Sequence, residues 1–274
     1  MIRKKLLPLV LALLALGHTA AAQSPLTIFS NATPRTPIDP DTNPVTLGVK
    51  FRSSQSGTIS GIRFYRAARS SSGYVARLYK ADGTMLASKS VSTEPCSTLP
   101  CWEELDFASP ISIGPNITYV AAYFVMGGRY AGDTNGLANA VTSGSLVAPA
   151  SAQIGGNGVY RYGASIAFPN QTYQASNYWV DVAFTPSAPS LMMSFNPPNP
   201  SIPSNAPPGT AVAVVNVTWS NGAPFTGTLK FAAPYGDDSG AFVLSGNDII
   251  INPNGPSIGA AGGTTQNITI NAVQ

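Results

Sequence analysis

Seven residues in stretches rich in Gly and Asn could recognise a ligand. They are four tyrosines and three polar residues: Arg129, Tyr130, Asp133, Asn157, Tyr160, Tyr162 and Tyr173. A flat aromatic face can pack against the C–H face of a sugar ring while neighbouring amides and carboxylates hold its hydroxyl groups. The sequence therefore predicts a carbohydrate-binding surface built from loops. In the alternative interpretation, the tyrosines only cover the ends of a β-sandwich, with their hydroxyls in water.

One short acidic loop could bind calcium. Residues 39–43 read Asp-Pro-Asp-Thr-Asn, which resembles the start of a D-x-D-x-N calcium loop. An EF-hand loop would need Gly where Pro44 stands and Glu where Lys50 stands, so that loop is excluded. A different calcium site, with oxygen ligands from Asp39 and Asp41, stays open beside the alternative of an acidic turn.

The densest carboxylates, Glu103, Glu104 and Asp106, could suggest glycoside hydrolysis. A glycoside hydrolase needs two carboxyl groups on opposite sides of a cleft. Glu104 and Asp106 should instead share one face of a strand, about 7 Å apart. We therefore favour a solvated strand face, and a hydrolase that uses carboxylates alone is the less favoured alternative.

Histidine occurs once, as His18 in the amino-terminal segment. The rest of the chain therefore lacks the usual proton shuttle, which excludes Ser-His-Asp and Cys-His catalysis in their usual forms. Metal sites with imidazole ligands are excluded for the same reason. We predict that the protein is not an enzyme and, calcium apart, needs no cofactor.

The two cysteines, Cys96 and Cys101, are separated by four residues, two of them polar and one a proline. In an exported protein, two cysteines this close are expected to form a disulfide. The alternative, a redox-active pair, usually has the tighter C-x-x-C spacing.

The amino terminus has the pattern of an export signal. Three basic residues precede an apolar run at residues 6–16, which is shorter than the ~20 residues that a membrane span requires. Alanines at residues 20–22 supply a small-residue cleavage pattern. We predict a signal peptide at residues 1–22 and a secreted, periplasmic or cell-surface protein. The remaining chain carries 12 basic and 12 acidic residues and no further apolar run of membrane length, so neither nucleic acid nor membrane insertion is expected.

Alternation of apolar and other residues with period two recurs along the chain, whereas helical periodicity hardly occurs. Strands are expected near residues 47–51, 62–64, 76–78, 117–125 and 178–184. Turn signals rich in Gly, Asn and Asp separate them. The pattern predicts an all-β fold, with a jelly-roll-like antiparallel β-sandwich as its first domain.

A change in composition marks a second domain. Residues 23–185 form the expected first sandwich, residues 186–190 a Pro-punctuated linker, and residues 191–274 a smaller, immunoglobulin-like or cadherin-like β-sandwich. Prolines crowd residues 196–209, so the first strand of the second domain should be an interrupted edge strand.

Five short segments carry a resemblance to a known family. They are residues 47–51 (Leu-Gly-Val-Lys-Phe), 61–65 (Gly-Ile-Arg-Phe-Tyr), 118–121 (Thr-Tyr-Val-Ala), 157–160 (Asn-Gly-Val-Tyr) and 177–182 (Asn-Tyr-Trp-Val-Asp-Val). The stretch from about residue 26 to 184 resembles domain of unknown function 4082, found in secreted bacterial proteins. The resemblance implies a β-sandwich module, often placed beside immunoglobulin-like or cadherin-like repeats and sometimes beside carbohydrate-active domains. It implies no established activity and therefore no catalytic residues.

These observations predict a non-enzymatic exported binding protein that recognises an extracellular glycan or surface polymer through loop aromatics. The alternative is a structural adhesion or matrix protein that acts through protein contacts. The Pro-rich edge of the second domain could then pair with a strand of a protein partner.

Overall fold

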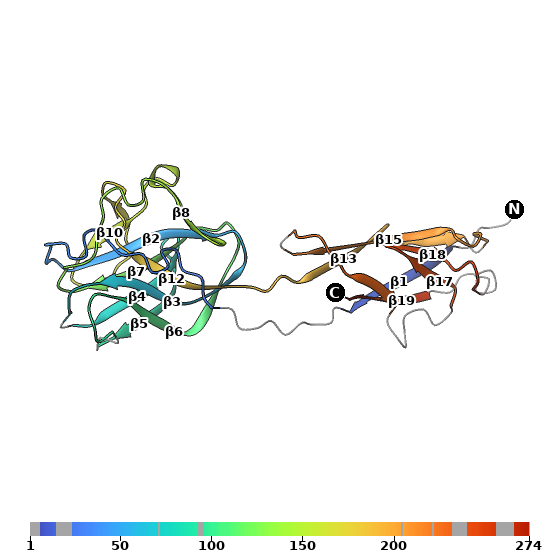
Figure 1. Ribbon diagram of the computed structural model, residues 1–274, viewed down its shortest axis with the longest axis horizontal. Coiled ribbons are helices and arrows are strands. Elements are labelled where there is room, and N and C mark those ends of the chain that lie inside the picture. Colours follow the sequence, from blue (N-terminus) through green and yellow to red (C-terminus); the bar gives the residue numbers. More distant parts are fainter. Residues whose placement is uncertain are drawn as a thin grey trace. The chain divides into compact units, whose positions relative to one another are not determined.

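The computed structural model describes residues 6–14, 24–70, 72–92, 96–203, 205–220, 222–231, 240–255 and 266–273. Strands make up half of the chain and helix about 1%, which confirms the predicted all-β class. Two compact units are present (Figure 1): the first unit is Ala22–Ser187, and the second unit combines Met1–Ala21 with Ala188–Gln274. The predicted cleavage point lies outside the described residues. Within them, no helix is both long and apolar enough to cross a membrane.

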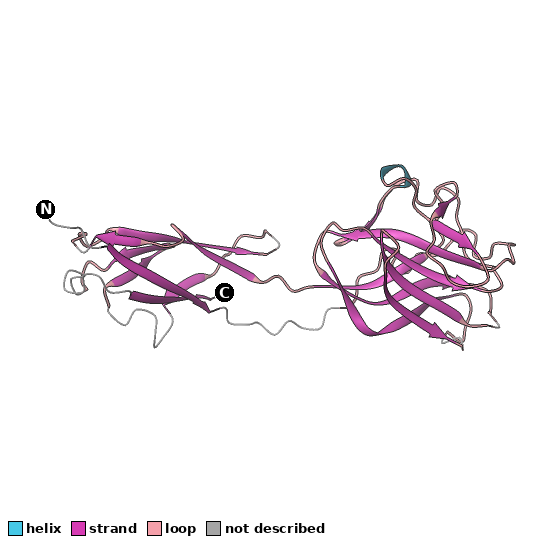
Figure 2. Cartoon of the chain, turned by 180° about the vertical axis from the view of Figure 1, so that it is seen from behind, coloured by secondary structure: helices cyan, strands magenta, loops and turns pink. Residues whose placement is uncertain are grey.

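The first unit is an antiparallel sandwich of two sheets. The larger sheet contains β2 (Val45–Ser53), β4 (Tyr74–Lys80), β5 (Met85–Val91), β7 (Tyr119–Val125), β8 (Val141–Ser143), β9 (Leu146–Ala148), β10 (Val159–Tyr162) and β11 (Gln171–Thr172). Its strand order is β11-β10-β2-β7-β4-β5, and the hairpin of β8 and β9 is attached to β2. The smaller sheet contains β3 (Gly57–Arg66), β6 (Cys101–Ile113) and β12 (Val180–Pro186), in the order β12-β3-β6. A short 3-10 helix, η1 (Ser151–Gln153), is the one helical element in the described chain (Figure 2).

Aromatic and aliphatic side chains from both sheets fill the space between them. Phe64 of β3 stacks on Tyr123 of β7, with ring centroids 4.1 Å apart and planes 7° from parallel. On the other face of β7, Val120 and Ala122 are buried together with Phe168, which comes from the loop after β10. A strand buried on both faces reads as a continuous apolar run rather than a strict alternation, as β7 does.

Two strands begin later than the sequence pattern predicts. β7 starts at Tyr119, and Ile117 is 50% exposed in the turn before it. β12 starts at Val180 because Trp179 has a φ of 53°, which interrupts the extended backbone. Tyr178 is consequently released from the strand and becomes part of a loop.

A buried carboxylate anchors the start of the first unit. Asp181 of β12 is fully buried and accepts hydrogen bonds from the backbone N–H groups of Ile28 (2.7 Å) and Phe29 (3.0 Å). Arg63 of β3 lies 3.5 Å from the same carboxylate. Burial raises the pKa of Asp181, although these hydrogen bonds and Arg63 oppose the shift. One side chain thus ties the amino-terminal segment to the smaller sheet.

Cys96 and Cys101 form the predicted disulfide. The loop that it closes contacts a buried ion pair, in which Arg66 Nε lies 2.7 Å from Glu103 Oε2. Arg66 also donates to the carbonyl oxygen of Cys96 at 2.7 Å, and the backbone N–H of Cys96 donates to Glu103 at 3.3 Å. The cystine loop therefore supplies hydrogen bonds that a buried charge pair needs.

The second unit is also built from two sheets. One contains β13 (Leu191–Asn196), β15 (Ala211–Trp219), β18 (Asp248–Ile251) and β17 (Phe242–Ser245), in that order. The other contains β14 (Ser201–Pro203), β1 (Leu6–Leu14), β19 (Gln266–Val273) and β16 (Thr228–Phe231), in that order. Val215 and Ile249 from the first sheet and Ile268 and Ile270 from the second share one apolar core. All pairings are antiparallel except that of β1 with β19.

Candidate functional site

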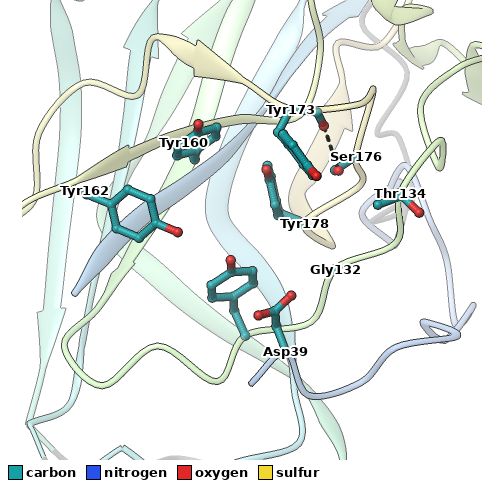
Figure 3. Close-up of a pocket in the computed structure, with 9 residues that line it drawn as sticks. Asp39, Gly132, Thr134, Tyr160, Tyr162, Tyr173, Ser176 and Tyr178 are labelled. Atoms are coloured by element: carbon teal, nitrogen blue, oxygen red, sulfur yellow. Dashed lines mark hydrogen bonds between the residues drawn. The ribbon is translucent and has the colours of Figure 1, made fainter. Parts of the chain in front are cut away.

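The four predicted tyrosines line one hollow in the first unit. Tyr160 and Tyr162 lie on β10, Tyr173 directly follows β11, and Tyr130 lies in the loop after β7. We call this space the tyrosine hollow; it measures about 300 Å³ and is lined by Asp39, Tyr130, Gly132, Thr134, Tyr160, Tyr162, Tyr173, Ser176 and Tyr178. In Figure 3 the side chains of Tyr160, Tyr162 and Tyr178 lie around the same space, with Asp39 at its lower side. Residues distant in the sequence therefore build one surface.

The rings of the tyrosine hollow contact one another edge to face. The ring centroids are 5.6 Å apart for Tyr160 and Tyr162, 6.2 Å for Tyr160 and Tyr178, and 5.9 Å for Tyr130 and Tyr178. Edge-to-face contacts are favourable because the positive edge of one ring meets the negative face of the next. The chain of contacts fixes the orientation of aromatic faces that come from three segments.

The acidic loop at residues 39–43 joins two of these rings. Asp41 Oδ2 accepts a hydrogen bond from the Tyr162 hydroxyl at 2.6 Å and lies 3.5 Å from the Tyr130 hydroxyl. The backbone N–H of Asp39 donates to the carbonyl oxygen of Tyr130 at 2.7 Å. The backbone N–H of Arg129 donates to the carbonyl oxygen of Asp41, also at 2.7 Å. The acidic loop and the loop after β7 therefore hold each other in place.

The hydrogen bond between Asp41 and Tyr162 changes the pKa of both groups. Burial would raise the pKa of Asp41, but hydrogen bonds from Tyr162, Asn43 and Tyr130 outweigh it, so the pKa lies below its ordinary value of 3.8. The bond to Asp41 raises the pKa of Tyr162, and burial raises the pKa values of Tyr130 and Tyr178. At neutral pH these three tyrosines are therefore protonated and can donate hydrogen bonds.

Unusual backbone conformations surround the tyrosine hollow. In the described part of the chain, seven residues other than glycine have positive φ, and five of them directly adjoin a lining residue. These five are Arg129, Asn135, Gln174, Ala175 and Trp179. Each such conformation costs on the order of 1 kcal/mol and persists only where the surrounding structure holds it. The loops of the hollow are thus fixed in one shape.

A second hollow adjoins the first at Tyr162. It measures about 480 Å³ and is lined by Asn43, Pro44, Tyr162, Gly163 and Ala164; we call it the side hollow. Tyr162 is 48% exposed and lines both spaces. A bound molecule that contacts this side chain can therefore extend from one space into the other.

The structure uses the predicted ligand residue Asp133 as a structural anchor. Its carboxylate is buried and accepts hydrogen bonds from the backbone N–H groups of Arg35 (3.0 Å) and Thr36 (2.9 Å). The indole N–H of Trp179 donates to it at 3.2 Å. Asp133 does not line the tyrosine hollow. Its hydrogen bonds instead fix the segment at Arg35 and Thr36 and the side chain of Trp179.

Asn157 and Arg129, the other two predicted polar ligand residues, also lie outside the lining. Asn157 is fully buried; its amide donates to the carbonyl oxygens of Lys50 and Pro149 and accepts from the backbone N–H of Lys50. This bonding fixes the loop before β10 against β2. The Arg129 side chain is exposed.

Sequence reasoning missed three lining side chains: Thr134, Ser176 and Tyr178. Alternation from Val180 to Phe184 assigned Tyr178 to a strand, and only the positive φ of Trp179 removes it from that strand. Ser176 is held by its hydroxyl, which donates to the Tyr173 carbonyl oxygen at 2.7 Å (Figure 3). No periodic pattern in the sequence indicates this turn.

Oxygens of the predicted calcium ligands, Asp39 and Asp41, are used within the acidic loop. Asp39 Oδ1 accepts the backbone N–H of Asp41 at 2.9 Å, and Asp41 Oδ1 accepts both the backbone and the side-chain N–H of Asn43. In the described chain, the one cluster of three groups of metal-ligating type is Cys96, Cys101 and Glu103, whose sulfurs are joined in the disulfide. Calcium binding by the acidic loop stays a prediction.

The carboxylates considered for hydrolysis lie on β6, away from the lining of the tyrosine hollow. Glu103 is buried against Arg66, whereas Glu104 and Asp106 are exposed. Glu104 Oε2 lies 3.4 Å from Arg63 Nε. Partial burial raises the pKa of Glu104, and the charge of Arg63 opposes this.

The fold and the hollow define an all-β sandwich module with a hollow lined by aromatic side chains. Residues 31–180, which are more than half of the chain, match the family described as "Domain of unknown function (DUF4082)". The chain belongs to this family, which confirms the resemblance of its first domain. The matched span contains every residue of the tyrosine hollow. No curated protein matches the chain.

Proposed function

We propose that the protein is a non-enzymatic, exported binding protein whose first unit recognises an extracellular carbohydrate or surface polymer. One observation supports the proposal most strongly. The four tyrosines predicted from residue type and sequence surroundings come from separate segments, and they line a single hollow. Ligand sites commonly combine apolar walls with a few fixed polar groups, and the tyrosine hollow has that composition. We place the protein outside the cell, at the cell surface or in the periplasm, after removal of residues 1–22.

The charges of the site favour a ligand without acidic groups. Asp39 is the one charged residue among the nine that line the tyrosine hollow. Asp41 lies outside this lining, where its carboxylate contacts the hydroxyls of Tyr162 and Tyr130. Lysine and arginine are absent from this lining, so a uronic acid or a sulfated sugar would meet carboxylates without a compensating cation. The oxygens of the tyrosine hydroxyls can instead accept hydrogen bonds from sugar hydroxyls. We therefore propose a neutral glycan.

The side hollow supports a chain rather than a single sugar as the ligand. Tyr162 lines both spaces and is half exposed, so one sugar ring can stack on its side chain while the neighbouring sugar units of the chain occupy the two spaces. A polymer that contacts several fixed rings gains affinity without ordering flexible loops on binding. Longer oligosaccharides should consequently bind more tightly than single sugars.

A glycan array with residues 23–274 tests this function. Neutral oligosaccharides should bind, and Tyr162→Ala should weaken the best of them about tenfold, as is typical for loss of an aromatic contact worth more than 1 kcal/mol. Ile117→Ala is the matched control, because Ile117 is also half exposed but lies outside both hollows. Lack of binding to every glycan by a folded chain would reject the proposal.

Two other functions have distinct signatures. An adhesion or matrix protein that acts through protein contacts would keep its partner after Tyr160→Ala and Tyr130→Ala. A hydrolase that uses carboxylates alone would degrade a polysaccharide and lose that activity in Glu104→Gln. The ion pairs of Glu103 with Arg66 and of Glu104 with Arg63 favour a structural role for both carboxylates.

Calcium is a separate proposal for the acidic loop. If Asp39 and Asp41 bind the ion, adding calcium to the metal-free chain should raise the melting temperature of the first unit, and Asp39→Asn should abolish that rise. We also propose that the second unit is an immunoglobulin-like or cadherin-like repeat that spaces or docks the first.

A further inference from the structure

The second unit contains a strand from the opposite end of the chain. β1 lies beside β19 (Figure 1) and pairs with both β14 and β19. Residues 9–14 pair in parallel with residues 266–271, and residues 6–8 pair antiparallel with residues 201–203. β1 thus pairs with β14 through its first three residues and with β19 through its remaining six.

The same segment is the apolar run of the predicted signal peptide. Cleavage after residue 22 would remove β1 and leave residues 201–203 of β14 and residues 266–271 of β19 without this partner. We call these two strand edges, the borders that β1 leaves, the strand slot. In the described chain β14 has no other partner strand, and residues 266–269 of β19 pair with no strand except β1.

The β19 border of the slot lacks the devices that protect a free sheet edge, whereas β14 is short and contains a proline. Natural edge strands carry charged residues, especially lysine, or are covered by other segments. Neither β14 (SIP) nor β19 (QNITINAV) contains a charged residue, and β19 contains no proline. Beneath them, Ile202, Ile268 and Ile270 belong to the core of the second unit. After removal of β1, the edge of β19 therefore remains able to pair with another strand.

The occupant must be apolar and uncharged. The strand that occupies the slot has the sequence LLPLVLALL, and residues 191–274 contain only one basic and three acidic residues, with none on either border. A charged strand would therefore find no partner for its charge there.

We propose that export, by removing residues 1–22, opens the strand slot and that it then accepts an apolar, uncharged strand of about nine residues from another exported protein. Main-chain hydrogen bonds to β19 and β14 would provide the affinity, as in other cases of strand addition. This function belongs to the second unit and is independent of the tyrosine hollow.

A peptide with the sequence LLPLVLALL and a solubilising tail of lysines tests the proposal on residues 23–274. Amide hydrogen exchange at residues 201, 202 and 266–269 should slow at least tenfold when the peptide is added. The first unit should show no change, and Tyr162→Ala should leave the effect intact. A peptide with Ala→Pro at its seventh position should protect less, because proline removes a donor in the segment that pairs with β19.

Several results would overturn the proposal. Residues 266–269 could already be protected in the peptide-free monomer, or could become protected only as the protein concentration rises, which would mean self-association. The peptide could also fail to slow exchange. Mass spectrometry of the exported chain that still finds residues 1–22 would reject it as well. Asn267→Pro provides a second check: it should abolish the protection, and exchange in β13, β15, β17 and β18 reports whether the unit stays folded.

Discussion

The two units share a two-sheet architecture but are stabilised differently. Residues 23–190 carry 11 basic and 9 acidic residues, and some of these are buried in ion pairs such as Arg66 with Glu103. Residues 191–274 carry one basic and three acidic residues, and the core of the second unit is apolar. The first unit also has a disulfide. Its polar contacts fix loops, whereas strand pairing over an apolar core dominates the described part of the second unit.

The two units therefore differ in the kind of binding surface that we propose for each. In the first unit, buried groups such as Asp133 and Asn157 hold loops so that tyrosines can project around a hollow. In the second unit, one sheet includes β1, which the predicted cleavage would remove. A preformed hollow suits a glycan chain that stacks on fixed rings, while an incomplete sheet suits an extended strand.

The largest effect should come from the buried anchor of the first unit. Asp181→Ala should lower its free energy of unfolding by about 3 kcal/mol, because two backbone N–H groups and Arg63 lose their buried partner. Chemical denaturation that resolves the two units would measure the change. Asp106→Ala, at an exposed position, is the control and should stay within about 0.5 kcal/mol. An equal loss in the second unit would contradict the distinction drawn between them.

The disulfide should have the next largest effect. Replacing Cys96 and Cys101 with serine should cost the first unit about 2 kcal/mol, since the short loop becomes free in the unfolded chain. Thermal unfolding with and without reductant would show it, and the transition of the second unit should not move. If reduction changed neither transition, the cystine loop would not support the buried pair of Arg66 and Glu103.

A smaller effect is expected at Tyr173, which lines the tyrosine hollow and is 54% exposed. Two variants of this residue separate the contribution of its ring from that of its hydroxyl. Tyr173→Ala should reduce glycan affinity several-fold, whereas Tyr173→Phe should retain most of it if stacking dominates. Titration calorimetry would measure both. Tyr79→Phe removes a hydroxyl from a buried tyrosine outside the hollow and serves as the control. Equal losses in both Tyr173 variants would assign the contact to the hydroxyl.

The smallest effect should be the pH dependence of the acidic loop. Because the pKa of Asp41 is lower in the folded chain, its stabilising bond with Tyr162 is complete above pH 3.8 and is lost as the pH falls through the lower folded value. Glycan binding should weaken in that acidic window. Asp41→Asn should remove this component, and a variant that kept the same acid dependence would point to another group.

Much of the fold could be predicted because burial imposes its pattern locally. Alternation located the strands around Leu47 and Phe64, and residue spacing predicted the disulfide. The start of β12 could not be predicted, because the positive φ of Trp179 is held by contacts with Asn177 and Asp133 rather than by neighbours alone. The positions of the polar residues could not be predicted for a related reason: the sequence around an asparagine in a Gly-rich loop is the same whether its amide faces solvent or a buried carbonyl.

The sequence by itself determined the all-β class, the disulfide and the tyrosines that could form a site, since residue type and short spacing decide these features. Only the tertiary structure decided which of them meet. Tyr130, Tyr160 and Tyr173 come together because β7 and β10 both pair with β2 and β11 continues the same sheet. Likewise, pairing between residues 9–14 and 266–271 depends on which sheet edge is left without a partner, and no local sequence pattern indicates that edge.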